Sequence, residues 1–440
     1  MSKNRKSAHT KISGTIGISV LVSLLWSLSG CLVSNVQTER PFNALGRSAQ
    51  LELAHDGYVI GIEKRERSKV NGPARHYSDR FQALPKDSPQ TKTLNARFHD
   101  LTNDPNVMLV THIGSFFENR RFLYNAYAAY GIEDTDYESG YEALELFQQD
   151  LANRLSTAQA DGIPYTHILL TAMGWNSDQH KTIWWNNHIL ANMKKAAEAN
   201  GETEHFRPLV IALTWPSVWK GISDSWFEQK VLGHVGSYFN KAADADEIGY
   251  TLANWVLHKQ LPEIREAYEG EDFPVVVGIG HSFGARLLTR AMASKGHLKA
   301  GSRSQTRPLD LFIGLQGAFS ANRFISGAGI EGSPYENFQE WGLPMVLSSS
   351  NHDLATPVAK YISGASHIGG MYGLQVAIEE NEIFEVMKWE GSPSPQLQHD
   401  KILVVECDGI LHGMDAHNDI IDMEMGKLIW TFTRLAKRQK

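Results

Sequence analysis

Continuous apolar runs alternate with amphipathic segments from residue 107 to the C-terminus, and this rhythm limits the possible folds more than any other feature of the 440-residue chain. Strands are predicted at 107–111, 167–171, 208–214, 273–279, 309–315, 344–348 and 401–406. Helices are predicted at 141–157, 181–200, 242–268 (with breaks at Gly249 and Pro262), 285–294 and 419–437. The alternation is typical of an α/β fold with a mostly parallel sheet, helices on both faces and functional groups at the carboxyl ends of the strands.

The first 31 residues have the pattern of an export signal. Four basic residues (Lys3, Arg5, Lys6 and Lys11) precede an apolar stretch at 16–28 that is shorter than the roughly 20 residues of a membrane span. The stretch ends in Leu-Ser-Gly-Cys at 28–31, which resembles a bacterial lipobox. The resemblance implies a lipoprotein signal peptide at 1–30 and lipidation, including palmitate, of Cys31. An uncleaved anchor helix is the alternative.

Residue 32 and the region after it bear on location and domain organisation. Leu32 stands where an Asp would retain a lipoprotein in the inner membrane, so the outer membrane of a bacterial envelope is favoured. We expect a tether at 31–50 and one globular domain at 51–440. Its first part, 51–106, is predicted to be an irregular extension, with an early strand within 51–62 and a solvated charged loop at 63–69. The net charge of −7 gives no support to nucleic-acid binding.

A glycine-flanked serine interrupts the apolar run near residue 280. The segment Gly280-His281-Ser282-Phe283-Gly284 fits G-x-S-x-G and lies between a predicted strand and a predicted helix. A strained turn at this place exposes the serine hydroxyl at a helix N-terminus, where free N–H groups favour a developing anion. Ser282 is therefore a candidate nucleophile.

From residue 107 to the C-terminus the chain resembles the α/β-hydrolase superfamily, in particular serine hydrolases of the esterase and lipase type. The resemblance implies a triad in the order Ser, acid, His and places the acid after a later strand. Asp353 follows the predicted strand at 344–348 and forms a D-x-x-x-P pattern with Pro357, whereas the strand before it ends in Gln316 without a carboxylate. Asp353 is thus the candidate acid, with helix capping as its alternative role.

Two histidines follow the last predicted strand. His417 stands directly before the closing helix, where the resemblance implies the general base, and His412 is the alternative base. The oxyanion donors implied are the backbone amides of Phe283, next to the nucleophile, and of Trp175 in the sequence AMGWNSD. Met173 replaces the histidine that relatives commonly carry in that loop, which leaves the backbone donor in place.

A metal site is the competing interpretation of the late histidine region. The segment 412–422 contains His412, Asp415, His417, Asp419 and Asp422, and such groups can hold a metal ion. The spacing matches no established metal motif, and Asp is common at a loop-to-helix junction as a cap and dipole partner. We predict no metal and no other cofactor.

These patterns predict a lipid-anchored carboxylic ester hydrolase that acts through an acyl-enzyme. Three long segments, 215–238, 318–341 and 361–399, are candidates for the walls or lid of a substrate site. The expected partners are a small-molecule or lipid ester and the membrane that holds the anchor. The alternatives are an inactive hydrolase-fold lipoprotein that binds at the envelope, and an acyltransferase.

Overall fold

The computed structural model describes residues 52–66, 79–84, 94–96, 98–99, 106–126, 137–175, 177–217, 234–269, 272–327, 331, 335, 337–391, 397–412 and 416–438. The signal peptide, Cys31 and the tether predicted at 1–50 lie outside these residues, as do Trp219 and Trp226 of the candidate lid. Within the described residues, no helix is both long and apolar enough to cross a bilayer.

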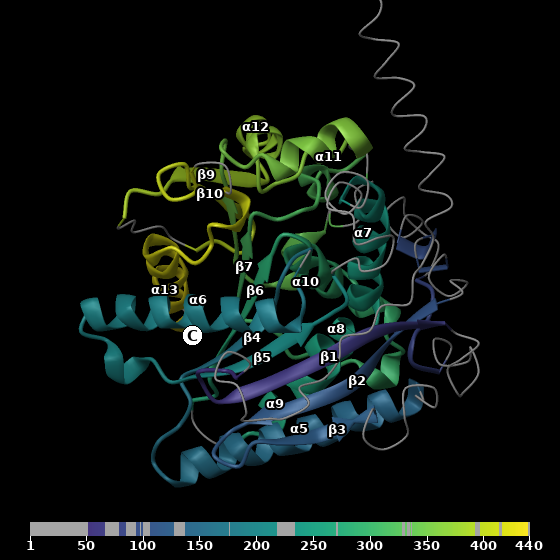
Figure 1. The fold of residues 1–440 in the computed structure, drawn as a ribbon, viewed down its shortest axis with the longest axis vertical. Coiled ribbons are helices and arrows are strands. Elements are labelled where there is room, and N and C mark those ends of the chain that lie inside the picture. The colour runs from purple at the N-terminus through teal and green to yellow at the C-terminus, as the bar shows by residue number, and fades with distance from the viewer. Residues whose placement is uncertain are drawn as a thin grey trace, which may run out of the picture.

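Ten strands form one sheet. They are β1 (Gly57–Glu66), β2 (Asn106–Phe116), β3 (Arg121–Asn125), β4 (His167–Ala172), β5 (Pro208–Thr214), β6 (Val275–His281), β7 (Leu311–Leu315), β8 (Met345–Ser349), β9 (Phe384–Lys388) and β10 (Ile402–Glu406). Their order is β3-β2-β1-β5-β4-β6-β7-β8-β10-β9 (Figure 1). The pairs β1–β2 and β2–β3 are antiparallel, and every other pair is parallel.

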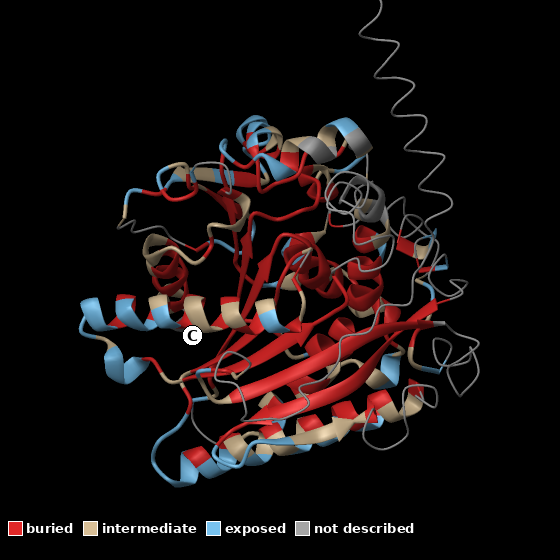
Figure 2. Ribbon diagram, in the orientation of Figure 1, coloured by how far each residue is buried: buried red, intermediate tan, exposed pale blue. Residues whose placement is uncertain are grey.

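Helices cover both faces of the sheet. They are α5 (Tyr137–Ala160), α6 (Gln179–Ala199), α7 (His234–Tyr250), α8 (Leu252–Trp255), α9 (Leu261–Ala267), α10 (Phe283–Ala293), α11 (Ala355–Ser363), α12 (Met371–Glu379) and α13 (Met423–Arg438). Helices α6 and α13 share one hydrophobic cluster, whereas α5 and α7 to α10 belong to the cluster on the opposite face. Strands β2 and β4 to β8 are buried throughout, whereas the edge strands β3 and β9 are largely half-buried or exposed (Figure 2). The α/β architecture predicted from the sequence is confirmed.

All seven predicted strands are present, but two further regions differ from the prediction. The excursion at 361–399 contains α12 and an edge strand, β9, which pairs with β10. The helix predicted at 242–268 begins earlier, at His234, and continues through α8, a π-helical turn at Val256–Gln260 and α9. The predicted break near Gly249 is present, because α7 ends at Tyr250 and Thr251, with φ −113° and ψ −92°, separates it from α8. A Cβ at Gly249 would lie 2.6 Å from Cβ of Arg290, so this glycine also allows α7 to pack closely on α10. Pro262 stands in the first turn of α9, where its missing N–H is tolerated.

The prediction of a solvated loop at 63–69 is wrong for residues 63–66. These residues complete β1, which pairs with β2 along its whole length and with β5 over residues 57–61. Glu63, Lys64 and Arg65 are buried, and they are tolerated because their charges are paired: Lys64 lies 2.6 Å from Asp244, and Arg65 lies 2.6 Å from Glu63. The second half of β1 was therefore mistaken for a loop, because its sequence is a run of charged residues.

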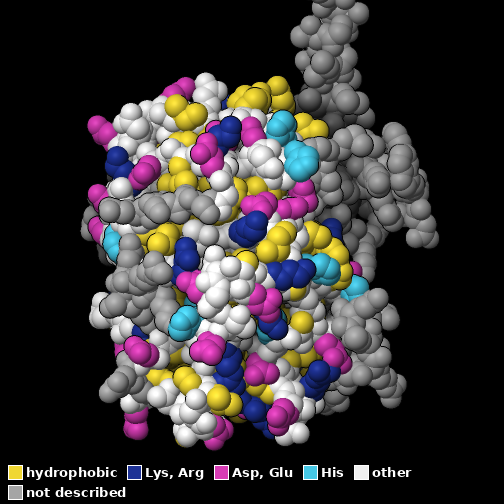
Figure 3. Space-filling view, turned by 90° about the vertical axis from the view of Figure 1, so that its left-hand side faces the viewer, with side chains coloured by type: hydrophobic (Ala, Val, Ile, Leu, Met, Phe, Trp, Pro, Cys, Tyr) yellow, Lys and Arg dark blue, Asp and Glu magenta, His cyan; other side chains and the backbone are white. Residues whose placement is uncertain are grey.

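The surface carries charges of both signs. On the side that faces the viewer in Figure 3, Lys and Arg side chains are interspersed with Asp and Glu.

The strand order creates a topological switch point at the carboxyl ends of β4 and β6, because the chain passes from β4 to β5 on one side of β4 and then to β6 on the other side. Binding sites of open α/β sheets lie at such points.

Candidate active site

Ser282 occupies a strained turn between β6 and α10. Its backbone has φ 54° and ψ −120°, a conformation that a non-glycine residue rarely adopts. The flanking glycines explain how the turn fits. A Cβ at Gly280 would lie 2.5 Å from Cα of Ala285, and one at Gly284 would collide with the carbonyl oxygen of Ala172. The G-x-S-x-G pattern therefore answers a packing requirement of this turn.

The loop after β4 touches the side chain of Ser282. A Cβ at Gly174 would lie 2.5 Å from Cβ of Ser282 and 3.0 Å from its Oγ. The neighbouring Met173 is buried, and its carbonyl oxygen accepts a hydrogen bond of 2.9 Å from the indole of Trp215. This loop, which carries Trp175, is thus held against the candidate nucleophile.

Three side chains from distant parts of the sequence form one hydrogen-bonded relay. The distance from Ser282 Oγ to His417 Nε2 is 2.9 Å, and the distance from His417 Nδ1 to Asp353 Oδ2 is 2.7 Å. Because the buried carboxylate accepts a hydrogen bond from Nδ1–H, Nε2 is free to accept the proton of the Ser282 hydroxyl. Asp353 follows β8 and His417 follows β10, so the relay lies at the carboxyl edge of the sheet.

Asp353 also holds the start of α11. Its Oδ1 accepts hydrogen bonds from the amides of Ala355 (2.9 Å) and Thr356 (3.2 Å), so the capping role and the contact with His417 coexist. Burial alone would raise the pKa of Asp353, but the charge and hydrogen bond of His417, together with the two amides, lower it below its usual value. The carboxylate therefore stays ionised beside the imidazole.

His281, the residue before Ser282, contacts His417, the candidate base. Its Nε2 donates a hydrogen bond of 2.8 Å to the backbone carbonyl of His417, and the two ring centroids are 5.1 Å apart. Burial, aided by the neighbouring His417, lowers the pKa of His281 to about 3 and keeps its ring neutral. No role for His281 was expected from the sequence, since it occupies a variable position of the motif.

His412 lies outside the relay. It is exposed, and its Nδ1 donates a hydrogen bond of 2.7 Å to the carbonyl of Ile410. Of the residues weighed as metal ligands, Asp415 falls outside the described residues. Among the residues that are described, no group of three or more His, Cys, Asp or Glu side chains is arranged to hold a metal ion.

The candidate oxyanion donors flank Ser282 from two elements. Phe283 is the first residue of α10, so its N–H has no acceptor within the helix and lies at the positive end of the helix dipole. Trp175 lies in the loop that contacts Ser282, and its ring centroid is 6.3 Å from that of Phe283. Phe283 thus directly follows the candidate nucleophile, and Trp175 directly follows the glycine that packs against it.

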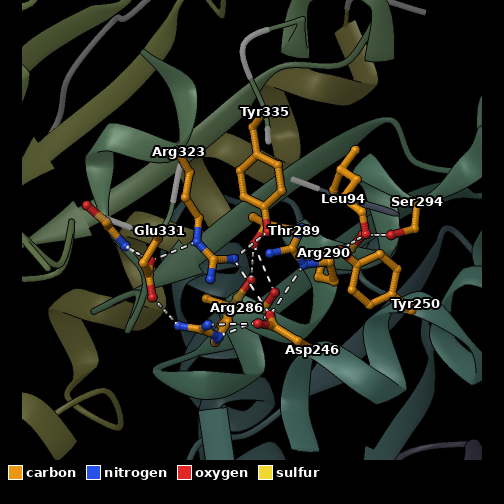
Figure 4. Close-up of polar contacts among 12 residues, drawn as sticks. Leu94, Asp246, Tyr250, Arg286, Thr289, Arg290, Ser294, Arg323, Glu331 and Tyr335 are labelled. Atoms are coloured by element: carbon orange, nitrogen blue, oxygen red, sulfur yellow. Dashed lines mark hydrogen bonds and ion pairs between the residues drawn. The ribbon is translucent and has the colours of Figure 1, made fainter. Parts of the chain in front are cut away.

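A buried charge network adjoins the nucleophile and was not foreseen from the sequence. Figure 4 shows Arg286 and Arg290 of α10 meeting Arg323, Asp246 and Glu331. Asp246 lies 2.7 Å from Arg286 and 3.4 Å from Arg290, and Glu331 lies 2.7 Å from Arg286 and 2.8 Å from Arg323. The two arginines four residues apart on α10 were the signal that could have pointed to it.

The network also contacts the backbone segment after β7, which in turn contacts Ser282. Glu331 accepts a hydrogen bond of 2.9 Å from the amide of Ser320, and the amide of Ala318 donates one of 3.1 Å to the carbonyl of Ser282. The segment after β7 is therefore tied both to the turn and to α10.

Comparisons with protein-family models, with curated proteins and with solved structures found no match to this chain. The interpretation of the site accordingly depends on its geometry.

Proposed function

We propose that this protein is a serine hydrolase of the α/β-hydrolase superfamily that cleaves carboxylic esters through an acyl-enzyme. The observation that carries the proposal is the relay from Ser282 through His417 to Asp353, with distances of 2.9 and 2.7 Å. The strained turn and the loop of Gly174 against the serine support the same conclusion. Its sheet of ten strands exceeds the eight typical of the superfamily, with β9 added beyond β10 at one edge.

In the proposed reaction, Oγ of Ser282 attacks the ester carbonyl carbon while its proton passes to Nε2 of His417. The amides of Phe283 and Trp175 stabilise the oxyanion of the tetrahedral intermediate. The bond to the leaving alcohol then breaks as His417 returns the proton to the alcohol oxygen. Water attacks the acyl-enzyme with His417 again as the base, and the carboxylic acid and free Ser282 are released.

Asp353 orients the imidazole and stabilises its protonated form during both steps. No step in this scheme needs a metal or an organic cofactor. The proposed setting is the bacterial envelope, with the chain anchored by lipid on Cys31 and with a small-molecule or lipid ester as substrate.

The direct kinetic test is Ser282→Ala with p-nitrophenyl butyrate as substrate. We expect the rate to fall by about 10⁴-fold or more, with little change in the melting temperature. Full activity in this variant would overturn the proposal. Wild-type protein that transfers butyrate to an added alcohol in preference to water would instead identify an acyltransferase, and inactive but folded wild-type protein would favour a binding function.

A further inference from the structure

A cavity of about 430 Å³ lies at the end of the sheet opposite to Ser282. Pro308 and Leu343, which line it, come shortly before β7 and β8, so the cavity faces the amino ends of these strands. Lys295, just after α10, lines another wall. The volume falls within the range of about 300–1,000 Å³ that small-molecule sites occupy.

Part of the lining is apolar. It is built from Leu84, Leu94, Met292, Pro308, Trp341 and Leu343. One part of this wall is held by the buried charge network: the hydroxyl of Tyr250 donates a hydrogen bond of 3.3 Å to the carbonyl of Leu94, and Arg290 lies 4.9 Å from the Tyr250 ring centroid (Figure 4). These contacts hold the Leu94 side of the cavity in place.

Positive charge dominates the polar lining. Three cationic residues, Lys295, Arg303 and Arg307, line the cavity together with a single carboxylate, that of Glu340. Arg307 is paired with Asp310 at 2.8 Å, but Asp310 also lies 2.8 Å from Arg265, so one carboxylate serves two guanidinium groups. The cavity thus keeps an excess of positive charge.

Lys295 and Arg303 both line the cavity, and their charges act on each other. Burial and the charge of Arg303 both lower the pKa of Lys295. In the described part of the chain, neither side chain forms an ion pair with a carboxylate. His258, which also lines the cavity, adds no charge because burial and Lys295 lower its pKa to about 3. Two neighbouring cations at an apolar wall favour a ligand that brings negative charge.

We propose that this cavity binds an amphipathic anion, a carboxylate or sulfonate carried on an apolar aryl or alkyl body. The anionic group lies between Lys295 and Arg303, and the apolar body packs on Trp341 and Leu343. This site is separate from Ser282, so the inference does not depend on the proposed esterase activity.

The test is calorimetric titration of the full chain with 2-naphthoate and, in parallel, with uncharged 2-naphthamide. We expect one site for 2-naphthoate, with weaker binding as salt is added. The double variant Lys295→Gln, Arg303→Gln should bind about tenfold less tightly or worse, as loss of charge-assisted hydrogen bonds predicts. The double variant Lys299→Gln, Arg207→Gln removes the same charge outside the cavity and should bind like the wild type.

Two further measurements make the result decisive. Ala293→Phe, which fills the cavity from its wall, should lose binding while its melting temperature shows that it remains folded. Protein whose serine has been blocked with a fluorophosphonate should bind 2-naphthoate unchanged. The proposal is overturned if the wild type binds no 2-naphthoate at millimolar concentration, if the amide binds equally well, or if blocking Ser282 abolishes binding.

Discussion

Helix α10 takes part in two polar clusters, the relay at Ser282 and the buried charge network at Arg286. They differ in whether a proton can move between their side chains. At the first turn of α10, Ser282 meets His417 and Asp353 in a relay in which a neutral hydroxyl faces a nitrogen that can accept its proton. One turn later, Arg286 belongs to a network of five charged side chains. Burial alone would raise the pKa of Asp246, but Arg286 and the other arginines hold it far below its usual value.

Under the proposed function the relay transfers a proton, whereas the network holds its protons fixed and supports the fold. In the network, the ionised forms are favoured so strongly that no group can exchange a proton near neutral pH. In the relay, only Asp353 is held in one state, and it fixes the ring whose other nitrogen contacts Ser282. Changes in the relay should therefore affect rate, and changes in the network should affect stability.

The largest expected effect is on rate, from Asp353→Asn. The amide keeps the size of the side chain and an acceptor for the α11 amides, but it cannot fix the required tautomer of His417. We expect kcat for p-nitrophenyl butyrate to fall by about 10⁴-fold. Thermal melting should show a folded protein, and Asp161→Asn on the surface should keep both rate and stability. Wild-type rates in Asp353→Asn would mean that the relay is not catalytic.

The opposite behaviour is expected for Asp246→Asn. This change leaves Arg286, Arg290 and Arg323 facing one remaining carboxylate in a buried site. The free energy of unfolding should fall by about 3–5 kcal/mol, which urea denaturation measures. A loss of less than about 1 kcal/mol, the value for exposed pairs, would show that the network does not stabilise the fold.

A smaller effect on rate is expected from Gly174→Ala. The new methyl group would lie 2.5 Å from Cβ of Ser282, so the loop or the serine must move. A displacement of this kind costs about 10²-fold in rate. Gly301→Ala is the matched control, because a Cβ there meets nothing within 4 Å. Equal rates in the two variants would show that the Gly174 loop does not set the position of the nucleophile.

The smallest effect per residue is a dependence of stability on pH. Burial is the main cause that lowers the pKa of His258, His281 and His367 to about 3 and of His112 and His297 to about 4. The unfolded chain, with histidine pKa values of about 6.5, takes up these protons first as the pH falls. Stability should therefore decline from about pH 6.5 towards pH 4, by up to about 1.4 kcal/mol per pH unit for each histidine.

Urea denaturation at pH 7.5, 6.0 and 5.0 measures this slope. His297→Gln should make the slope shallower, whereas His205→Gln, at an exposed position, should leave it unchanged. A free energy of unfolding that stays constant over this range would contradict the buried neutral state of these rings.

The sequence predicted the parts of the molecule that follow local rules. Apolar runs identified seven strands, and G-x-S-x-G marked the turn at Ser282 because a tight turn requires its glycines. Prediction from the sequence failed where tertiary contacts outweigh the local preference of the residues. Glu63, Lys64 and Arg65 look like a solvated loop, yet they lie in β1. Their burial is compensated because Lys64 pairs with the distant Asp244, and Glu63 and Arg65 pair with each other within the strand.

The residues of the candidate site also fall into those that the sequence nominated and those whose contacts depend on tertiary packing. The resemblance together with the position after a strand nominated Asp353 and His417, and the place of His417 directly before the closing helix favoured it over His412. The contact of His417 with Ser282 depends on the path of the loop after β10, which has no local signature. The support of His417 by His281 also depends on tertiary packing, because it joins two segments 136 residues apart.

The most direct test of the central claim is to locate the covalent adduct of a fluorophosphonate probe by peptide mass mapping. We expect a single adduct on the peptide that contains Ser282, at an unchanged rate in His412→Ala and at a rate near zero in His417→Ala. An adduct on another residue, no adduct in the wild type, or loss of labelling with His412→Ala alone would contradict it.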